Sequence, residues 1–321
     1  MTSEGLIAYE AQRLPAYTGN TFYNRKNVLD YWITFAEEEG VDFDSADKDD
    51  VIQWLLWLRD ERKHAHSTIA QNLLELHSIF TWIDKKDYGE NICEKLEKKE
   101  DYDWLNAAPE KVKNSAEGVT YVNKQDYKLM LEACESVRET IICESLAQLG
   151  LRRVELRWLM TDAFDLENNR VTIKTAKRYD ENGNNLFLPG FYPTQYKLLV
   201  KKWKNGERKG WVAGIDGGSD YLVTGHKKPP IRVGEVTEIV RDVADRAGIQ
   251  GYHDDAMGRS WAKVTPHALR HSYGVWRAKA GMPLSQVSKL MRHADVQTTY
   301  DYYLRFSGED LQDAYETYRV F

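Results

Sequence analysis

The spacing of the apolar residues constrains the fold of this chain more than any other feature. Within 67–83, Ile69, Leu73, Leu76, Phe80 and Ile83 recur at intervals of three and four, which places them on one face of an α-helix. Segments 20–39 and 47–63 show the same periodicity, and Gly40 directly follows the first of them. The N-terminal part of the chain is therefore predicted to be a small all-helical unit.

Helical periodicity returns after a change in composition. Residues 94–118 are charged and poor in apolar residues, and Pro109 and Gly118 interrupt them. The predicted organisation is a helical domain over 1–105, a linker over 106–118 and a second domain over 119–321.

The second domain is predicted to combine many helices with one small hairpin. Residues 170–174 and 185–189 have the composition of short strands, and the segment 179–185 between them is rich in turn residues. The remaining periodic segments predict helices: 124–136, 138–149, 193–204, 235–247, 267–280, 285–291 and 311–318. The fold class is therefore mainly α, in two domains, with a small β-hairpin.

Composition favours a soluble protein in a reducing compartment. Charged residues make up 29% of the chain, and no run approaches the roughly 18 apolar residues of a membrane helix. The N-terminal residues do not resemble a secretory signal. Cys93, Cys134 and Cys143 show no CxxC spacing and predict free thiols. We expect a cytoplasmic protein with no membrane partner.

The acidic net charge of −6 does not exclude a nucleic-acid partner, because the charge is unevenly distributed. Residues 1–115 carry 14 Lys and Arg against 23 Asp and Glu, a net charge of −9, whereas the remainder carries 30 against 27, a net charge of +3. The C-terminal part can therefore present a basic surface.

Three segments of the C-terminal part carry candidate chemistry. Residues 149–156 read LGLRRVEL, residues 265–271 read TPHALRH, and residues 290–303 read LMRHADVQTTYDYY. They supply arginines, histidines and tyrosines. Guanidinium groups bind phosphate oxygens in bidentate fashion and imidazoles exchange protons near neutral pH, so this set suits a phosphodiester.

Each segment alone also has an ordinary structural explanation. Arg152 beside a helix end is most often an ion-paired surface group. His267 and His271 have the i, i+4 spacing of a metal pair but lack the glutamate of an HExxH motif. Tyr300, Tyr302 and Tyr303 alone would more often be packing residues.

Together and in this order, the three segments resemble the tyrosine site-specific recombinases of the phage-integrase and Xer type. Residues 150–156 match the family pattern G-L-R-x-x-E-L, and residues 267–271 match H-x-L-R-H. The third pattern, G-H-x-D-x-x-T-T-x-x-Y, matches residues 292–302 except that Arg292 replaces the usual glycine. The N-terminal helical unit resembles the core-binding domain of the family.

The resemblance implies a site that works on DNA without a metal or other cofactor. Arg152 and Arg270 would clamp the scissile phosphate, His267 would transfer a proton and His293 would hydrogen-bond the phosphate. Tyr302 would attack to give a 3′-phosphotyrosine. About one free tyrosine in a thousand is ionised at pH 7. Positioned hydrogen-bond donors stabilise the transition state by roughly 3–4 kcal/mol each, so these arginines and histidines can offset the weak nucleophilicity of a neutral tyrosine. Glu155 is interpreted as a structural brace.

The family uses a hairpin lysine to protonate the leaving 5′-oxygen, and two residues qualify. Lys177 follows Ala176 where the strand is expected to enter the turn, whereas Lys174 lies within the strand on the face opposite to Ile173. We favour Lys177 and keep Lys174 as the alternative.

Double-stranded DNA carrying specific sites is the implied partner. The resemblance implies a protein that is monomeric when free and forms a homotetramer on two DNA sites through a C-terminal tail helix. Phosphate contacts are expected from basic clusters, namely Lys201, Lys202, Lys204, Arg208, Lys209, Lys227 and Lys228.

Other functions remain open alternatives. A type IB topoisomerase and a telomere resolvase share this chemistry, although the N-terminal unit and the short motif spacing favour a recombinase. A catalytically inert DNA-binding accessory protein would not need the complete residue set. A metal-dependent hydrolase built on His267 and His271 would lose activity in a chelator.

Overall fold

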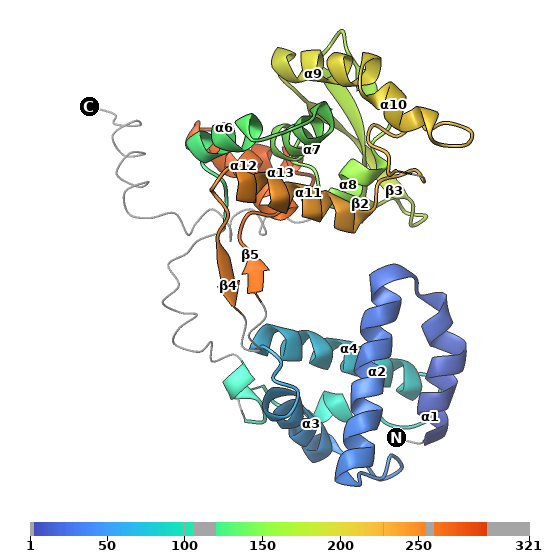
Figure 1. The fold of residues 1–321 in the computed structure, drawn as a ribbon. Helices are drawn as coiled ribbons and strands as arrows, with labels where there is room; N and C mark the ends of the chain where they lie inside the picture. Colours follow the sequence, from blue (N-terminus) through green and yellow to red (C-terminus); the bar gives the residue numbers. More distant parts are fainter. Residues whose placement is uncertain (1–2, 99, 106–119, 227, 255–259, 294–321) are drawn as a thin grey trace. The chain divides into compact units, whose positions relative to one another are not determined.

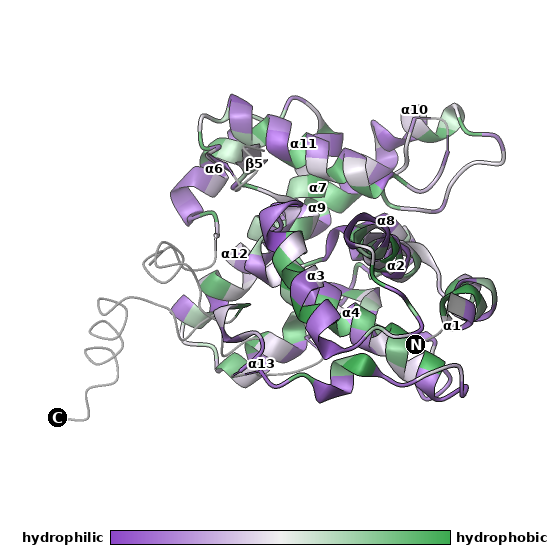
Figure 2. Cartoon of the chain, turned by 90° about the horizontal axis from the view of Figure 1, so that it is seen from below, coloured by the Kyte–Doolittle hydropathy of each residue, from purple (hydrophilic) through white to green (hydrophobic). Residues whose placement is uncertain are grey.

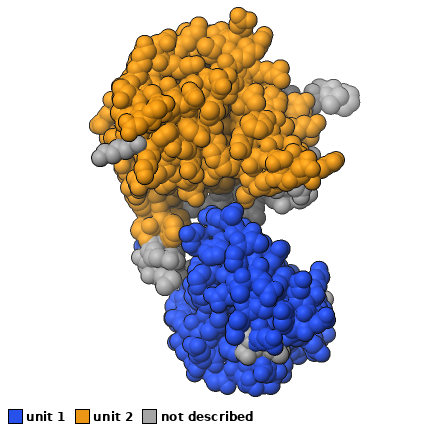
Figure 3. Space-filling view, turned by 90° about the vertical axis from the view of Figure 1, so that its right-hand side faces the viewer, with its two compact units in different colours: residues 1–116, 254–259 blue, residues 117–253, 260–321 orange. Residues whose placement is uncertain are grey.

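The computed structural model describes residues 3–98, 100–105, 120–226, 228–254 and 260–293. The chain divides into two compact units, residues 1–116 with 254–259 and residues 117–253 with 260–321 (Figure 3). The predicted linker 106–118 lies outside the described residues. Because the arrangement of the units relative to one another is not determined, each unit is considered by itself.

The first unit is all-helical, as the periodicity predicts. Its helices are α1 (Ser3–Ala8), a π-helical turn η1 (Tyr9–Arg13), η2 (Leu14–Ala16), α2 (Gly19–Glu39), α3 (Lys48–Asp60), α4 (His66–Asp84), η3 (Ile92–Lys95) and η4 (Asp103–Leu105). Helix α2 ends because Gly40 takes the left-handed conformation, with φ 71°. The N-terminal segment before α2 was not predicted to be helical.

Aromatic residues form the centre of the first unit. Trp32 on α2 is fully buried and makes edge-on contacts with Trp54 on α3 and Phe80 on α4. Figure 2 shows that helices such as α3 and α4 carry a hydrophilic and a hydrophobic side. The amphipathic stripes therefore meet around Trp32.

The second unit combines helices with two small antiparallel sheets (Figure 1). Its helices are α6 (Lys124–Glu132), α7 (Val137–Gln148), α8 (Arg153–Trp158), α9 (Thr194–Asn205), α10 (Arg208–Ala213), α11 (Val233–Arg246), α12 (Pro266–Lys279) and α13 (Leu284–Leu290). Its strands are β1 (Phe164–Asp165), β2 (Arg170–Tyr179), β3 (Asn185–Phe191), β4 (Tyr252–Asp254) and β5 (Ser260–Ala262). The mainly helical fold class is confirmed.

Helix α7 lies at the centre of the second unit. It packs against α12 on one side and α9 on another, and Ile141, Ile142 and Leu146 are fully buried. Helix α8, α10 and the short strands β1, β4 and β5 were not predicted, because a segment of two to six residues is too short to show a period.

The predicted hairpin is present but longer than the sequence indicated. Strand β2 continues to Tyr179, and its pairing with β3 is irregular between Lys174 and Tyr179. Ile173 and Thr175 are buried, whereas Lys177, within the irregular part of the strand, is exposed. Lys177 therefore lies within β2 rather than at the entrance of a turn.

The predicted tail helix 311–318 lies outside the described residues, as do Tyr300, Tyr302 and Tyr303.

Candidate active site

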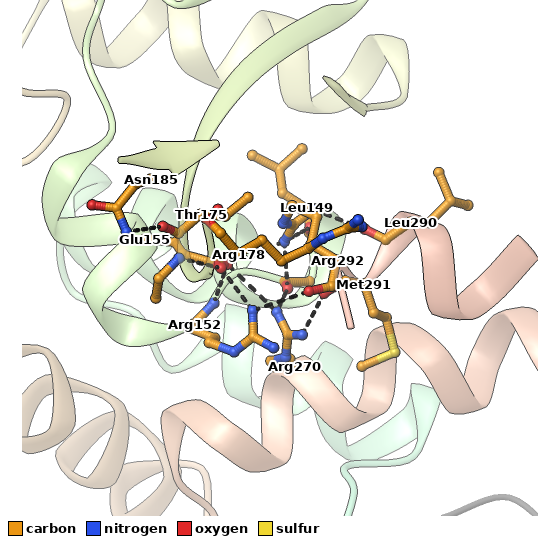
Figure 4. A network of polar contacts seen from close by, with 12 residues as sticks. Leu149, Arg152, Glu155, Thr175, Arg178, Asn185, Arg270, Leu290, Met291 and Arg292 are labelled. Carbon is orange, nitrogen blue, oxygen red and sulfur yellow. Dashed lines mark hydrogen bonds and ion pairs between the residues drawn. The ribbon is translucent and has the colours of Figure 1, made fainter. Parts of the chain in front are cut away.

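A buried carboxylate organises the site. Glu155 on α8 is 1% exposed, and its oxygens accept hydrogen bonds from Arg152 Nη1 at 2.8 Å, Arg270 Nη1 at 3.5 Å and Arg292 Nη2 at 3.3 Å (Figure 4). Burial alone would raise the pKa of Glu155, but Arg292, Arg270 and Arg152 together outweigh burial and lower it. Glu155 is therefore ionised and braces three guanidinium groups, as the sequence suggested for its role.

The position of Arg152 follows from the turn between α7 and α8. Gly150 has φ +57°, which an L side chain rarely adopts, and this turn places Arg152 at the N-terminus of α8. The backbone N–H of Arg152 donates to Glu155 Oε2 at 2.9 Å. The Arg152 side chain remains 18% exposed, so its guanidinium can still reach a ligand.

Helix α12 supplies two of the predicted residues. Its N-terminus is capped by Thr265, whose side chain accepts from the Ala268 N–H, and Pro266 occupies the first turn. His267 and Arg270 lie one turn apart on this helix. Arg270 is 1% exposed and donates to the carbonyl oxygens of Gly150 and Met291.

His293 follows α13 and joins the same group of residues. Its backbone N–H donates to the Ser288 carbonyl at 3.1 Å, which closes the end of the helix. Burial, Arg270, Arg152, Arg292 and His267 lower the pKa of His293 to about 3. Partial burial, Arg270, Arg152, Arg153 and Lys177 lower the pKa of His267 to about 4. Both imidazoles are therefore neutral at pH 7 in the free protein.

The structure places the two candidate lysines differently. Lys177 is exposed and lies close enough to His267 to lower the pKa of that imidazole. The neighbouring Ala176 N–H donates to Glu155 Oε1 at 3.3 Å, which attaches this part of β2 to the carboxylate that holds the arginines. Lys174 lies over the Trp158 ring, with 5.1 Å between Nζ and the ring centroid.

His271, the other member of the i, i+4 histidine pair, lies beside the site. Its ring meets that of His267 edge-on, with 4.3 Å between the centroids. Among the described residues no group of three or more His, Cys, Asp and Glu side chains is placed to hold a metal ion. Within this part of the chain the pair therefore lacks the third protein ligand that a catalytic zinc ion has.

The predicted DNA-binding residues do not gather at this site. Lys201 and Lys202 are exposed on α9, and α7 packs between α9 and α12. Lys204 Nζ donates to the Thr161 carbonyl at 3.0 Å, and Arg208 donates to the carbonyls of Ser219 and Tyr221. Both side chains therefore bind their own unit.

Three further residues were predicted to contact DNA. Lys209 and Lys228 are exposed, and Lys227 lies outside the described residues. The DNA contacts of all seven residues stay predictions.

Sequence reasoning missed the role of Arg292. Its side chain is fully buried and contacts Glu155 across 137 residues of sequence. In the sequence, the one indication of a special role was that Arg292 stands at the position where the third motif has glycine.

The second unit thus brings arginines, histidines and a lysine from distant segments together: Glu155 braces Arg152, Arg270 and Arg292, and the two histidines and Lys177 lie beside this group. Such a set of cations and imidazoles suits a phosphodiester. The description "Phage integrase family" belongs to the family model that matches residues 120–308. The chain belongs to this family. It is a tyrosine recombinase, a DNA breaking and rejoining enzyme that acts in site-specific DNA recombination.

Similar proteins carry names of the same kind. Tyrosine recombinase XerC of Herpetosiphon aurantiacus is 24% identical over 290 residues, which cover 89% of this chain and 84% of the relative. Tyrosine recombinase XerD of Listeria monocytogenes is 22% identical over 319 residues, which cover 94% and 93%.

Solved structures show the same fold. The Tn1549 transposon integrase in complex with transposon right end DNA matches with a TM-score of 0.67 and 17% identity, over 99% of each chain. XerH recombinase bound to difH substrate in a pre-cleavage complex matches with a TM-score of 0.64 and 17% identity, over 91% of this chain and 78% of XerH. No helix among the described residues is long and apolar enough to span a bilayer.

Proposed function

We propose that this chain cleaves and rejoins double-stranded DNA at specific sites through a covalent bond between Tyr302 and a 3′-phosphate, without a metal ion. One observation carries the proposal. Arg152, His267, Arg270 and His293 come from three separate segments and meet: Glu155 holds both arginines, and both histidines lie close enough to these arginines for their pKa values to be lowered by them. An intact constellation of this kind favours an active enzyme over an inert accessory protein, and recombinases among the relatives favour recombination over topoisomerase activity.

Arg152 and Arg270 supply positive charge for the nonbridging phosphate oxygens. Negative charge builds on these oxygens as the nucleophile attacks, and fixed donors in a partly buried site stabilise it without reorganisation. Glu155 holds both guanidinium groups in place before the substrate arrives. An arginine at a transferring phosphoryl group contributes about 10³–10⁵ in rate.

Proton transfer divides between a histidine and a lysine. His267 is neutral at pH 7 and accepts the proton of the Tyr302 hydroxyl as the oxygen attacks phosphorus. The bond from phosphorus to the 5′-oxygen breaks, and Lys177 protonates that oxygen to give a free 5′-hydroxyl. The bound phosphate is an anion, so it raises the pKa of His267 and His293 toward the range where proton transfer is efficient.

Rejoining is the reverse of cleavage. A 5′-hydroxyl attacks the phosphotyrosine, Tyr302 leaves and recovers a proton, and the DNA strand is restored. When the attacking hydroxyl belongs to a second DNA site, the strands are exchanged. We propose that the free protein is a monomer and that four copies assemble on two sites, in the cytoplasm, where Cys93, Cys134 and Cys143 remain free thiols.

Covalent trapping tests the proposed function. A nicked duplex, in which the leaving fragment diffuses away after cleavage, should accumulate a protein–DNA adduct that survives denaturation. The target sequence is first obtained by selecting bound DNA from a random pool. Adduct formation should persist in EDTA. DNA cleavage that leaves no adduct, is lost in chelator and recovers on adding zinc or magnesium would instead favour the metal-dependent hydrolase.

A further inference from the structure

Arg292 adopts a backbone conformation that an arginine normally avoids. Its φ is 57°, in the left-handed region that glycine adopts without penalty and other L residues do not. Among the described residues, Lys63, Asp87 and Asn169 are the other non-glycine positions with positive φ, and of these four side chains that of Arg292 alone is fully buried. Contacts of the side chain must therefore offset the backbone strain.

Those contacts join two segments of the site. Arg292 Nη2 donates to the carbonyls of Leu149 at 3.1 Å and Gly150 at 2.7 Å, in the turn that precedes Arg152. Nη1 donates to the Leu290 carbonyl at 2.8 Å, at the end of α13. In the opposite direction, Arg152 Nη1 approaches the Arg292 carbonyl at 3.5 Å. The turn carrying Arg152 is thus tied to the residue directly before His293 (Figure 4).

The Arg292 guanidinium is closed off from a DNA substrate. The side chain is 0% exposed, as is that of Glu155, to which it is ion-paired. Both terminal nitrogens of Arg292 donate to groups of its own unit, namely the carbonyls of Leu149, Gly150 and Leu290 and the carboxylate of Glu155. Its effect on catalysis is therefore expected to act through Glu155, Arg152 and His293.

We propose that Arg292 is a positioning residue that fixes His293 relative to Arg152, so that both address the same phosphate. The inference rests on the proposed function and deepens it. Arg292 ion-pairs with Glu155 and, through three carbonyls, sets the distance between the turn after α7 and the end of α13.

The decisive variant is Arg292→Gly. Glycine accepts the left-handed backbone, so the variant removes the side chain and relieves the backbone strain at once. Under single-turnover conditions with saturating protein, adduct formation on the nicked duplex should slow about 100-fold, the effect of a misplacement of about 1 Å in an oriented site. The affinity for an intact duplex should not change, because Arg292 does not reach the surface.

Asn169→Gly is the matched control. Asn169 also has positive φ, 54°, and lies in the turn between β1 and β2. This substitution relieves the same kind of backbone strain without touching the Glu155 cluster, so the rate of adduct formation should equal that of the unchanged protein.

A second measurement reports on position rather than on stability. The charged and titratable groups that face His293 are Arg270, His267 and His271 on α12, Arg152 at the start of α8, and Arg292 itself. Removing Arg292 takes away one cation and loosens the segment, so the pKa of His293 followed by NMR should rise from about 3 toward its ordinary value. The pH profile of adduct formation should move with it.

The possible outcomes separate the two proposals. If the unchanged protein forms no adduct, the proposed function fails. If the unchanged protein forms the adduct and Arg292→Gly forms it equally fast with an unshifted His293, the positioning role is wrong. If Arg292→Gly does not fold, Arg292→Lys is measured instead, because lysine keeps the charge but cannot donate to all four acceptors. The expected result is a rate of adduct formation between those of the unchanged protein and a protein without the side chain. An unchanged rate would overturn the inference.

Discussion

The Tyr273 ring packs directly on Gly150, so that a Cβ added to the glycine would lie 2.8 Å from Cγ and Cδ1 of the ring. Gly150 precedes Arg152 by two residues and has φ +57°, whereas Tyr273 is buried on α12 beside Arg270. The close approach therefore joins the turn that carries Arg152 to the helix that carries Arg270.

Gly150→Ala should destabilise the second unit and slow cleavage. The left-handed backbone costs about 1–2 kcal/mol for a residue with a Cβ, and overpacking against the ring costs about 1–3 kcal/mol more. Urea unfolding should therefore show a loss of about 2–5 kcal/mol.

Gly183→Ala provides the matched control for this prediction. Gly183 has φ +80° with no atom within 4 Å of the added Cβ. Gly183→Ala should therefore lose only the about 1–2 kcal/mol that the left-handed backbone costs, without the overpacking term. Equal losses in the two variants would show that the contact with Tyr273 is not tight.

Tyr302→Phe should bind the selected DNA normally and form no covalent adduct. The phenyl ring keeps the packing surface and lacks the hydroxyl that attacks phosphorus. Tyr300→Phe is the matched control and should give the normal adduct yield on the nicked duplex. A normal yield from Tyr302→Phe would assign the nucleophile to another tyrosine.

Lys177→Ala should fail on ordinary DNA and cleave a substrate with sulfur in place of the 5′-bridging oxygen at nearly the normal rate. A thiolate leaves without a proton, so it makes the general acid unnecessary. Lys174→Ala, which removes the lysine over Trp158, should not show this rescue. Rescue confined to Lys174→Ala would transfer the role to that lysine.

The stability of the free protein should fall as the pH drops below about 6.5. Burial, His267 and Arg270 lower the pKa of His271 to about 3, so between that value and 6.5 the unfolded chain binds a proton that the folded chain does not. Stability is then greatest above pH 6.5, and this residue alone contributes a slope that approaches about 1.4 kcal/mol per pH unit.

Urea unfolding between pH 5 and pH 7 measures that slope. His271→Gln should reduce the slope by the share of one imidazole, because His267 and His293 also have lowered pKa values and keep their contributions. His253→Gln, at an exposed position on β4, should leave the slope unchanged. A His271→Gln protein with the original slope would show that this imidazole is protonated in the folded state.

Deleting residues 309–321 should spare binding to a single site and reduce synapsis and strand exchange. The segment contains an apolar stripe of Leu311, Ala314 or Tyr315, and Tyr318 at helical spacing. Burying a large apolar side chain of such a stripe stabilises a contact by roughly 1.5–3 kcal/mol. Such a stripe suits an exchangeable contact with a neighbouring copy. If the shortened protein recombines two sites as well as the full chain, the tail folds on its own unit or is dispensable.

Local sequence patterns were enough to predict most helices and to propose the residues of the site. The stripe from Ile69 to Ile83 predicts α4 because helix geometry repeats every 3.6 residues, whatever lies elsewhere in the chain. The motifs around Arg152, Arg270 and His293 are likewise contiguous, so their residue types and order can be recognised without knowing the fold.

Tertiary structure decided what those residues do to one another. Nothing within the motif around Arg292 indicates that its side chain reaches Glu155, because the two lie 137 residues apart and meet only after α8, α12 and α13 have packed. The same holds for Lys204 and Arg208, whose hydrogen bonds to the carbonyls of Thr161 and Tyr221 appear only in the folded unit. Periodicity is a property of neighbouring residues, whereas burial, ion pairing and shifted pKa values depend on which distant segments come into contact.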